Sequence, residues 1–272
     1  SFPTRRSSDL PASGYYFSGW SDGSTTNPRT IVIGTTDVTL TASFAATPVI
    51  ATVDLGLTSG NLWATANLGA ANPWDYGDYY AWGETTTKSD YSWSTYLHCN
   101  GSSSSLTKYC NSSSYGKDGF TDALTTLEAA DDAATAVLGT GYSMPTYADW
   151  SELSNQCYWV WTSDYSGQGV AGYIVYKAKT DGDKGTKVYS GNTPSSSYSL
   201  TDSHIFLPAA GYRYDSCLSD GGSYGYFCSA SLYEYGPYYA RNCGFYSSRV
   251  CTDYGSYFYR YYGLSVRPVL RP

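Results

Sequence analysis

Helical spacing of apolar residues is confined to two short segments of this 272-residue chain, and this limits the possible folds more than any other feature. The first segment covers 124–138, where leucines are spaced among alanines. The second begins at Thr146, a good N-terminal helix cap with Asp149 three residues later. One face of this second helix would carry three apolar residues: Trp150, Leu153 and Cys157.

Short apolar runs bounded by glycine, proline, serine and asparagine make up most of the remaining sequence, and such runs are typical of strands. The runs that we expect to form strands are 62–67, 158–162, 172–177, 204–208, 226–231, 244–250 and 264–269. Two helices followed by many short strands indicate an α+β fold.

Net charge and the length of the apolar runs argue against two classes of partner, nucleic acid and membranes. Charged residues make up 14% of the chain and the net charge is −7, so there is no basic surface for nucleic acid. No apolar run approaches the length of a membrane span, and we expect no membrane insertion. The chain instead holds 31 tyrosines and 28 glycines, a composition that favours recognition surfaces because tyrosine offers a flat contact area with a polar tip.

Tyrosine is concentrated toward the C-terminus, where the 61 residues from Tyr212 onward hold 14 of the 31 tyrosines. For each single tyrosine, a half-buried strand position with its hydroxyl in water is an equally good interpretation. Taken together, the cluster predicts a surface that binds a protein or a glycan. The candidate ligand-binding residues are Tyr233, Tyr235, Tyr238, Tyr239, Arg241, Asn242, Tyr246, Arg249, Asp253, Tyr254, Tyr257 and Tyr259.

The seven cysteines cannot all pair with one another. Cys99 and Cys110 flank a serine-rich loop, and they are the best candidates for a local disulfide in an oxidising compartment. No pair of cysteines or histidines has the spacing of a zinc site, so we expect no metal and no cofactor.

Residues that carry catalysis in other proteins are sparse. The two histidines, His98 and His204, are more simply structural than catalytic. We expect Asp131 and Asp132 to lie on a solvated helix face, and 181–183 to form an exposed turn rather than a calcium loop. Paired carboxylates for glycoside hydrolysis would have to come from Glu84, Asp90, Asp131, Asp132 and Glu152, whose separations the sequence does not give.

The N-terminal region differs from the remainder of the chain. Residues 1–10 look like the translation of a sequencing adapter, so we expect them to be foreign to the natural protein. In 11–47, alternating apolar residues on both sides of the turn at 34–37 predict a hairpin. GWSDGSTTNPRT and LTASF make this segment similar to the last part of an internalin-type B-repeat, which implies a β spacer that ends in a linker at 45–50.

Five ordered motifs connect 50–272 to a known family. The motifs are WAT at 63–65, DYGDYYAWGE at 75–84, MPT at 144–146, IFLPAAGYR at 205–213 and GLSVRPV at 263–269. Together they resemble the Fibrobacter succinogenes major paralogous domain. The resemblance implies a C-type-lectin-like fold of the formylglycine-generating-enzyme type. The GLSVRPV ending also resembles variable proteins that are diversified by retroelements, which implies a rigid scaffold with a changeable surface.

The residue types near the C-terminus fit such diversification. Mutation of template adenines turns Asn codons into codons that never specify Lys, Gln, Glu, Met or Trp. From Tyr212 to Pro272 the only residue of these types is Glu234, whereas the preceding 211 residues contain 21 of them and predict about six here. The family usually has a Trp where this chain has Cys228, and 252–258 is longer than usual, so the outward direction of Tyr254 and Tyr257 is not assured.

These observations predict a non-catalytic ligand-binding protein, of the adhesin or receptor-binding type, on the outside of a bacterial cell. Two alternatives remain open at this stage. One is a receptor-binding protein of a phage tail, and the other is a catalytic relative of the formylglycine-generating enzymes, which would require a reactive cysteine pair.

Overall fold

The computed structural model describes residues 15–24, 39–46, 50–252 and 257–272. The chain divides into two compact units, Ser1–Val49 and Ile50–Pro272.

The first unit contains an antiparallel pair of strands, β1 (Tyr15–Trp20) and β2 (Ala42–Ala46), with an irregular register between Phe17 and Gly19. Its aromatic rings pack together, since the Phe17 ring lies 5.3 Å from that of Trp20 and 6.1 Å from that of Phe44. The hairpin expected around 34–37 lies outside the described residues.

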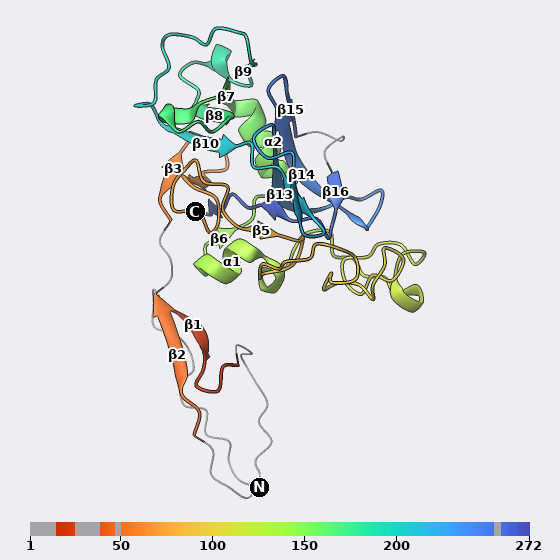
Figure 1. Ribbon diagram of the computed structural model, residues 1–272. Helices are drawn as coiled ribbons and strands as arrows, with labels where there is room; N and C mark the ends of the chain where they lie inside the picture. The colour runs from red at the N-terminus through yellow and green to blue at the C-terminus, as the bar shows by residue number, and fades with distance from the viewer. Residues whose placement is uncertain (1–14, 25–38, 47–49, 253–256) are drawn as a thin grey trace, which may run out of the picture. The chain divides into compact units, whose positions relative to one another are not determined.

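Most of the regular secondary structure in the second unit consists of strands, which form four sheets connected by long loops (Figure 1). The largest sheet has the order β15-β14-β13-β17-β5, and β16 pairs with the same edge of β14 as β15. Its strands are β5 (Tyr79–Tyr80), β13 (Tyr224–Leu232), β14 (Tyr239–Tyr246), β15 (Arg249–Cys251), β16 (Tyr257–Tyr259) and β17 (Leu264–Ser265).

The other three sheets are smaller. In the order β10-β8-β7-β9, one sheet is formed by β7 (Cys157–Thr162), β8 (Gly172–Lys177), β9 (Lys187–Val188) and β10 (His204–Pro208). In the order β3-β4-β18-β6, another is formed by β3 (Thr52–Asp54), β4 (Leu62–Ala64), β6 (Tyr142–Ser143) and β18 (Val269–Leu270). The last is the hairpin of β11 (Tyr212–Tyr214) and β12 (Cys217–Ser219).

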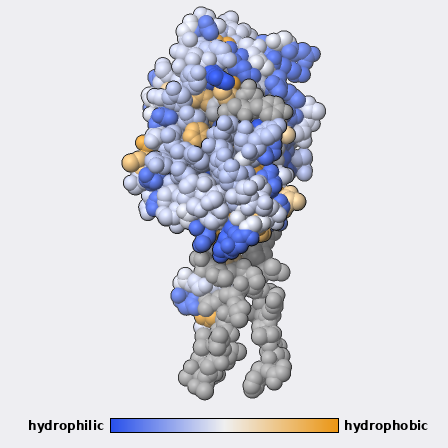
Figure 2. Space-filling model, turned by 90° about the vertical axis from the view of Figure 1, so that its right-hand side faces the viewer, coloured by the Kyte–Doolittle hydropathy of each residue, from blue (hydrophilic) through white to orange (hydrophobic). Residues whose placement is uncertain are grey.

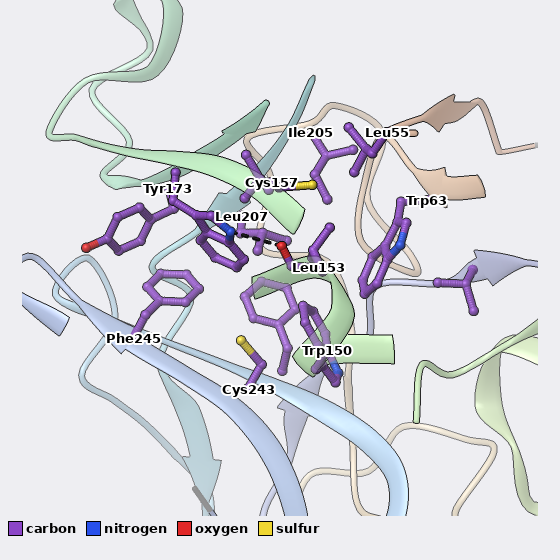
Figure 3. Close-up of a cluster of buried hydrophobic side chains, with 14 of the residues drawn as sticks. Leu55, Trp63, Trp150, Leu153, Cys157, Tyr173, Ile205, Leu207, Cys243 and Phe245 are labelled. Atoms are coloured by element: carbon purple, nitrogen blue, oxygen red, sulfur yellow. Dashed lines mark hydrogen bonds between the residues drawn. The ribbon is translucent and has the colours of Figure 1, made fainter. Parts of the chain in front are cut away.

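Helix α2 (Tyr147–Gln156) begins where the sequence predicted. The Thr146 side chain accepts a hydrogen bond from the Asp149 backbone N–H, and the Asp149 carboxylate accepts one from the Thr146 backbone N–H, so the cap is reciprocal. The buried face of α2 packs against β13 and β14. Trp150 and Leu153 lie in the main core with Trp63, Cys157 and the other side chains of Figure 3.

The first helix is shorter than predicted. Helix α1 covers only Ala133–Leu138, after a 3-10 turn at Ala129–Asp131, and the chain from Leu124 to Glu128 is not helical. The expectation that Asp132 faces solvent was wrong. Asp132 is buried and caps α1, because its carboxylate accepts hydrogen bonds from the backbone N–H groups of Thr135 (3.0 Å) and Met144 (2.8 Å).

Asp131 is not on a solvated helix face either. It is half-buried, and its Oδ2 lies 2.6 Å from Lys108 Nζ and accepts a hydrogen bond from the Tyr109 hydroxyl at 2.5 Å. Three further 3-10 turns are formed by Lys117–Gly119, Tyr165–Gly167 and Asp181–Asp183. In the last of these, Asp181 pairs with Lys184, and the Asp183 carboxylate caps the turn through Thr180.

The predicted disulfide between Cys99 and Cys110 is not formed, and all seven cysteines are free thiols. Each of these two thiols instead donates to nearby backbone oxygens, Cys99 to Trp93 and Cys110 to Ser112. The serine-rich loop between them is held by its own hydrogen bonds, such as that from the Asn100 backbone N–H to the Ser105 backbone oxygen (2.8 Å).

Two fully buried arginines tie the C-terminal segment to earlier parts of the chain. Arg267 donates to the Asn67 side chain and to the backbone oxygens of Ala64 and Phe206. Arg260 donates to the hydroxyl of Tyr96 and to three backbone oxygens. The guanidinium groups thus satisfy buried backbone acceptors in loops and strands. The second unit is mostly sheet with two α-helices among its described residues, which agrees with an α+β or mainly-β class.

Candidate ligand-binding surface

Six of the predicted tyrosines form one group of contacting rings, which we call the tyrosine cluster: Tyr233, Tyr235, Tyr238, Tyr239, Tyr257 and Tyr259. The turn between β13 and β14 carries Tyr233, Tyr235 and Tyr238. It is closed by backbone hydrogen bonds from the Gly236 N–H to the Tyr233 carbonyl oxygen and from the Tyr239 N–H to the Gly236 carbonyl oxygen. Strand β16 pairs with β14, and this register places Tyr259 opposite Tyr239.

The rings of the tyrosine cluster lie in direct contact. Tyr233 and Tyr257 are stacked with centroids 4.2 Å apart, Tyr239 and Tyr259 are 4.6 Å apart, and Tyr238 and Tyr239 are 4.4 Å apart. Tyr235 is 74% exposed and Tyr257 is 38% exposed, while the other four are half-buried. Each half-buried ring therefore has a fixed position and still offers an edge to solvent.

Hydrogen bonds between tyrosines raise the pKa of two cluster hydroxyls. A hydrogen bond with Tyr259, and then burial, raises the pKa of Tyr239 well above its usual value, and a hydrogen bond with Tyr115 does the same for Tyr238. At neutral pH these hydroxyls are donors as well as acceptors. The surface thus combines apolar ring edges with uncharged polar groups.

The aromatic contacts continue beyond the predicted residues. Tyr115 packs on Tyr238 with ring centroids 4.7 Å apart, and Trp93 and Tyr261 both contact Tyr259. Tyr261 in turn contacts Tyr214, which is exposed on the β11–β12 hairpin. Our prediction missed these residues because Trp93 and Tyr115 come from distant loops, although the density of tyrosine after Tyr212 was a usable signal for Tyr214.

Two predicted contact residues are buried, and their assignment to the surface was wrong. Arg241 is 4% exposed and Asn242 is 2% exposed. The Arg241 guanidinium binds Glu234 (Nη2–Oε1, 2.7 Å), and its central carbon lies 4.3 Å from the centre of the Tyr147 ring. The buried Arg241 contacts Glu234 and Tyr233 and so supports the surface from beneath. Strand alternation places Asn242 on the opposite face of β14.

The Arg241–Glu234 pair fixes the turn that carries the tyrosines. Partial burial raises the pKa of Glu234, but hydrogen bonds from Arg241 outweigh this and leave that pKa below its usual value. Glu234 therefore stays ionised at neutral pH. The guanidinium also lies over the ring of Tyr233, 5.3 Å from its centre, so one side chain anchors both the carboxylate and a cluster ring.

Tyr246 and Arg249 lie apart from the tyrosine cluster, beside a hollow of about 190 Å³ that we call the Tyr226 hollow. Gly244 lies between Tyr226 and Cys251 in the register of the sheet, and with no side chain it leaves space there. Strand side chains alternate between faces, so Gly244 and Tyr246 point to the face opposite Tyr239. The single predicted patch is thus two surfaces that meet at Tyr257. Asp253 and Tyr254 lie outside the described residues.

Hydropathy along this side of the second unit is moderate. Figure 2 shows the face on the right of Figure 1 mainly in pale and stronger blue, with apolar residues in isolated spots. A surface rich in tyrosine rings is only weakly hydrophobic, because each ring carries a hydroxyl group. Such a surface can remain exposed to water without the large apolar patch that drives aggregation.

Both histidines are engaged in structural contacts, and four of the seven cysteines are buried. His98 is buried and bonds the Gly83 backbone oxygen (2.8 Å), and burial lowers its pKa. His204 bonds the Tyr165 hydroxyl and the Asp202 backbone oxygen. Burial raises the pKa of Cys157 to about 12, and it also raises those of Cys228 and Cys243. Thiols with raised pKa values are weak nucleophiles at neutral pH.

Within the part of the chain that the structure describes, no three His, Cys, Asp or Glu side chains are grouped so as to hold a metal ion. None of its described helices has the length and apolar content needed to cross a membrane. Comparison with protein-family models, with curated proteins and with solved structures found no match to this chain.

Proposed function

We propose that this protein is a non-catalytic binding protein that recognises a protein or a glycan through the tyrosine cluster. The observation that carries the proposal is the contact of six tyrosine rings on the paired strands β14 and β16 and on the turn before β14, with Tyr235 and Tyr257 the most exposed. Binding through such rings loses little entropy because their neighbours already hold them in place.

The family resemblance supplies the proposed architecture. The second unit would be a C-type-lectin-like domain of the formylglycine-generating-enzyme type, a finer assignment within the observed α+β or mainly-β class. In this proposal the first unit is a β spacer that holds the binding domain away from a bacterial cell surface. A phage tail is the alternative location.

Retroelement diversification is proposed for the segment from Tyr212 onward. Glu234, which an adenine-mutated Asn codon cannot produce, would then belong to the constant framework. Its ion pair with Arg241 supports this role, because it fixes the turn on which variable tyrosines would be displayed. A near-identical non-coding copy of this segment beside a reverse transcriptase gene, differing almost only at adenines, is the expected genomic finding. A complete genome without such a copy would contradict diversification.

The binding proposal is tested with the double variant Tyr235→Ala/Tyr257→Ala, which removes the two most exposed cluster rings. The purified protein is screened on arrays of extracellular proteins and of glycans, and dissociation constants are measured for whichever array members bind. We expect the double variant to weaken binding at least tenfold. Tyr15→Ala is the matched control, since Tyr15 is 51% exposed but belongs to the first unit.

Equal binding by the double variant and the wild type would show that the tyrosine cluster is not the site. The catalytic alternative has its own readout. If the purified protein converts a cysteine in a substrate peptide to formylglycine, the non-catalytic proposal is wrong. Cys157, Cys228 and Cys243 give little support to that alternative, because burial keeps their thiols protonated.

A further inference from the structure

A second hollow, of about 350 Å³, lies on the sheet formed by β7, β8, β9 and β10. We call it the Asp164 hollow. Alternate residues of β7 and β8 point to opposite faces of the sheet. Trp159 and Val175 pack in the core with α2, whereas Val160 and Ile174 belong to a separate cluster on the other face. The hollow opens on this other face, away from α2, and all of its lining residues come from sequence before Tyr212.

The floor of the Asp164 hollow is apolar. Val160 and Ile174 are direct partners in the antiparallel register of β7 and β8, and both are buried. The buried ring of Tyr176 extends this floor along β8. An aliphatic chain that lies on these three side chains would be removed from contact with water along the side that faces the protein.

One wall is the turn at 164–169, and it is fixed to the sheet. The Tyr165 ring is stacked on that of Phe206 with centroids 4.0 Å apart, and the Tyr165 hydroxyl bonds His204 Nε2 at 2.9 Å. The Gly169 backbone N–H donates to Asp164 Oδ1 at 2.6 Å. Among the described residues the other carboxylate oxygen, Oδ2, has no hydrogen-bond partner.

The opposite wall comes from the segment that contains Pro194, Tyr198 and Leu200. The Tyr198 ring is stacked on that of Tyr158 with centroids 4.2 Å apart, and its hydroxyl accepts the Lys179 backbone N–H. Leu200 is 44% exposed at the rim. Both walls are therefore held by aromatic stacking, so a ligand would not have to order them on binding.

The negative charge of Asp164 favours a ligand with a cationic group. Asp164 is the only charged residue among the described residues that line the hollow, and Thr162, Ser166 and Ser199 add hydroxyl groups. Lys179 lies nearby over the Tyr198 ring, but its Nζ is paired with Asp202 at 2.7 Å. The chain as a whole carries a net charge of −7, which favours approach of a cationic group.

We propose that the Asp164 hollow binds a basic side chain, lysine or arginine, of a partner protein. The aliphatic stem lies on Val160, Ile174 and Tyr176, and the cationic end reaches the Asp164 carboxylate and the hydroxyls beside it. Leu200 contacts the residues that flank the basic side chain. This site is independent of the tyrosine cluster and adds a second recognition surface to the protein.

The test uses fluorescein-labelled Gly-Leu-Lys-Leu-Gly, its arginine version, and versions with acetyl-lysine or glutamate at the centre. Binding to the full chain is followed by fluorescence polarisation at low salt. The lysine or arginine peptide is expected to bind at least tenfold more tightly than the acetyl-lysine and glutamate peptides. Asp164→Asn keeps the shape of the side chain, and it is expected to weaken binding of the lysine or arginine peptide at least tenfold.

Asp181→Asn is the matched control, because Asp181 is an exposed acid outside the hollow that pairs with Lys184. It is expected to change the affinity less than twofold. Equal binding of the lysine and acetyl-lysine peptides, an unchanged affinity in Asp164→Asn, or no binding by either basic peptide would each overturn the proposal. Array ligands that depend on Tyr235 and Tyr257 should bind Asp164→Asn normally, so failure here is distinct from failure of the proposed function.

Discussion

The two ends of β14 use one face of the same strand in opposite ways. Toward its C-terminal end, Cys243 and Phe245 lie in the main core, beneath α2. At the other end, the face that carries Tyr239 is occupied by the tyrosine cluster and stays partly open to solvent. Arg241 lies between these ends, against Tyr147 in the first turn of α2.

In this fold, coverage by helix α2 determines which end of β14 is core and which is surface, more than the sequence of the strand does. The pleat gives the strand an identical alternation at both ends. Where α2 covers the strand, the side chains become core. Beyond Tyr147 no helix covers them, and the rings are held by one another and by loop side chains such as Tyr115 and Trp93. The tyrosine cluster is therefore an uncovered continuation of the core face, anchored by the Arg241–Glu234 pair.

The largest effect is expected from a change beneath the helix. Trp150 is fully buried, its ring lies 4.8 Å from that of Trp63, and its Nε1 donates to the Cys228 backbone oxygen at 3.0 Å. Trp150→Ala should reduce the free energy of unfolding by about 3–5 kcal/mol, because it leaves a cavity and an unpaired carbonyl. Urea unfolding measures this loss. A loss below about 1 kcal/mol would mean that this end of β14 is not the true core.

A smaller effect is expected at the border between the two ends. Arg241→Met keeps much of the aliphatic stem but removes the guanidinium, which should cost about 2 kcal/mol, since Glu234 is partly exposed and can regain water. The same variant should weaken array ligands of the tyrosine cluster, because the turn that carries Tyr233 loses its anchor. Lys184→Met breaks an exposed pair with Asp181 and serves as the control, with no measurable change in stability expected because solvent screens this pair. Equal losses in both variants would contradict the supporting role of Arg241.

The start of α2 should show an intermediate dependence. Thr146→Ala removes the cap hydrogen bond to the Asp149 N–H and should lower stability by about 1 kcal/mol. Because Tyr147 follows directly and contacts Arg241, faster hydrogen exchange is expected at the first turn of α2 and at Arg241. Exchange that accelerates at the first turn alone would show that the helix end and the tyrosine cluster are not coupled.

The sequence predicted those parts of the fold that depend on local patterns. Thr146 and Asp149 form a capping pattern within four residues, so the beginning of α2 was correctly predicted. The strands at 172–177 and 204–208 also match, since short apolar runs between turn residues specify them. The first helix was overestimated because Leu124 and Leu127 belong to a loop that packs against β13 rather than to a helical face.

Distant contacts account for the errors at the candidate site. Arg241 was placed on the surface because arginine is usually exposed, and nothing nearby in sequence shows that Tyr147 lies against it. Asp132 was predicted to face solvent because aspartate is also usually exposed, but it caps α1 and accepts a hydrogen bond from the Met144 backbone N–H. Six tyrosines were correctly placed close together, because neighbouring segments of a short hairpin bring them there without help from distant loops.

The smallest effect on stability is expected at the open end. Tyr235 is the most exposed cluster ring, and among the described residues its one ring contact is with Tyr233, at 5.7 Å. Tyr235→Ala should therefore change the free energy of unfolding by less than about 0.5 kcal/mol. The same change should still weaken an array ligand several-fold, because an exposed aromatic side chain gains its contacts only in the complex. A large loss of stability without a loss of binding would reverse the distinction between the two ends of β14. It would show that the tyrosines complete the core, and the recognition surface would then have to be sought at the Tyr226 hollow on the opposite face of the strand.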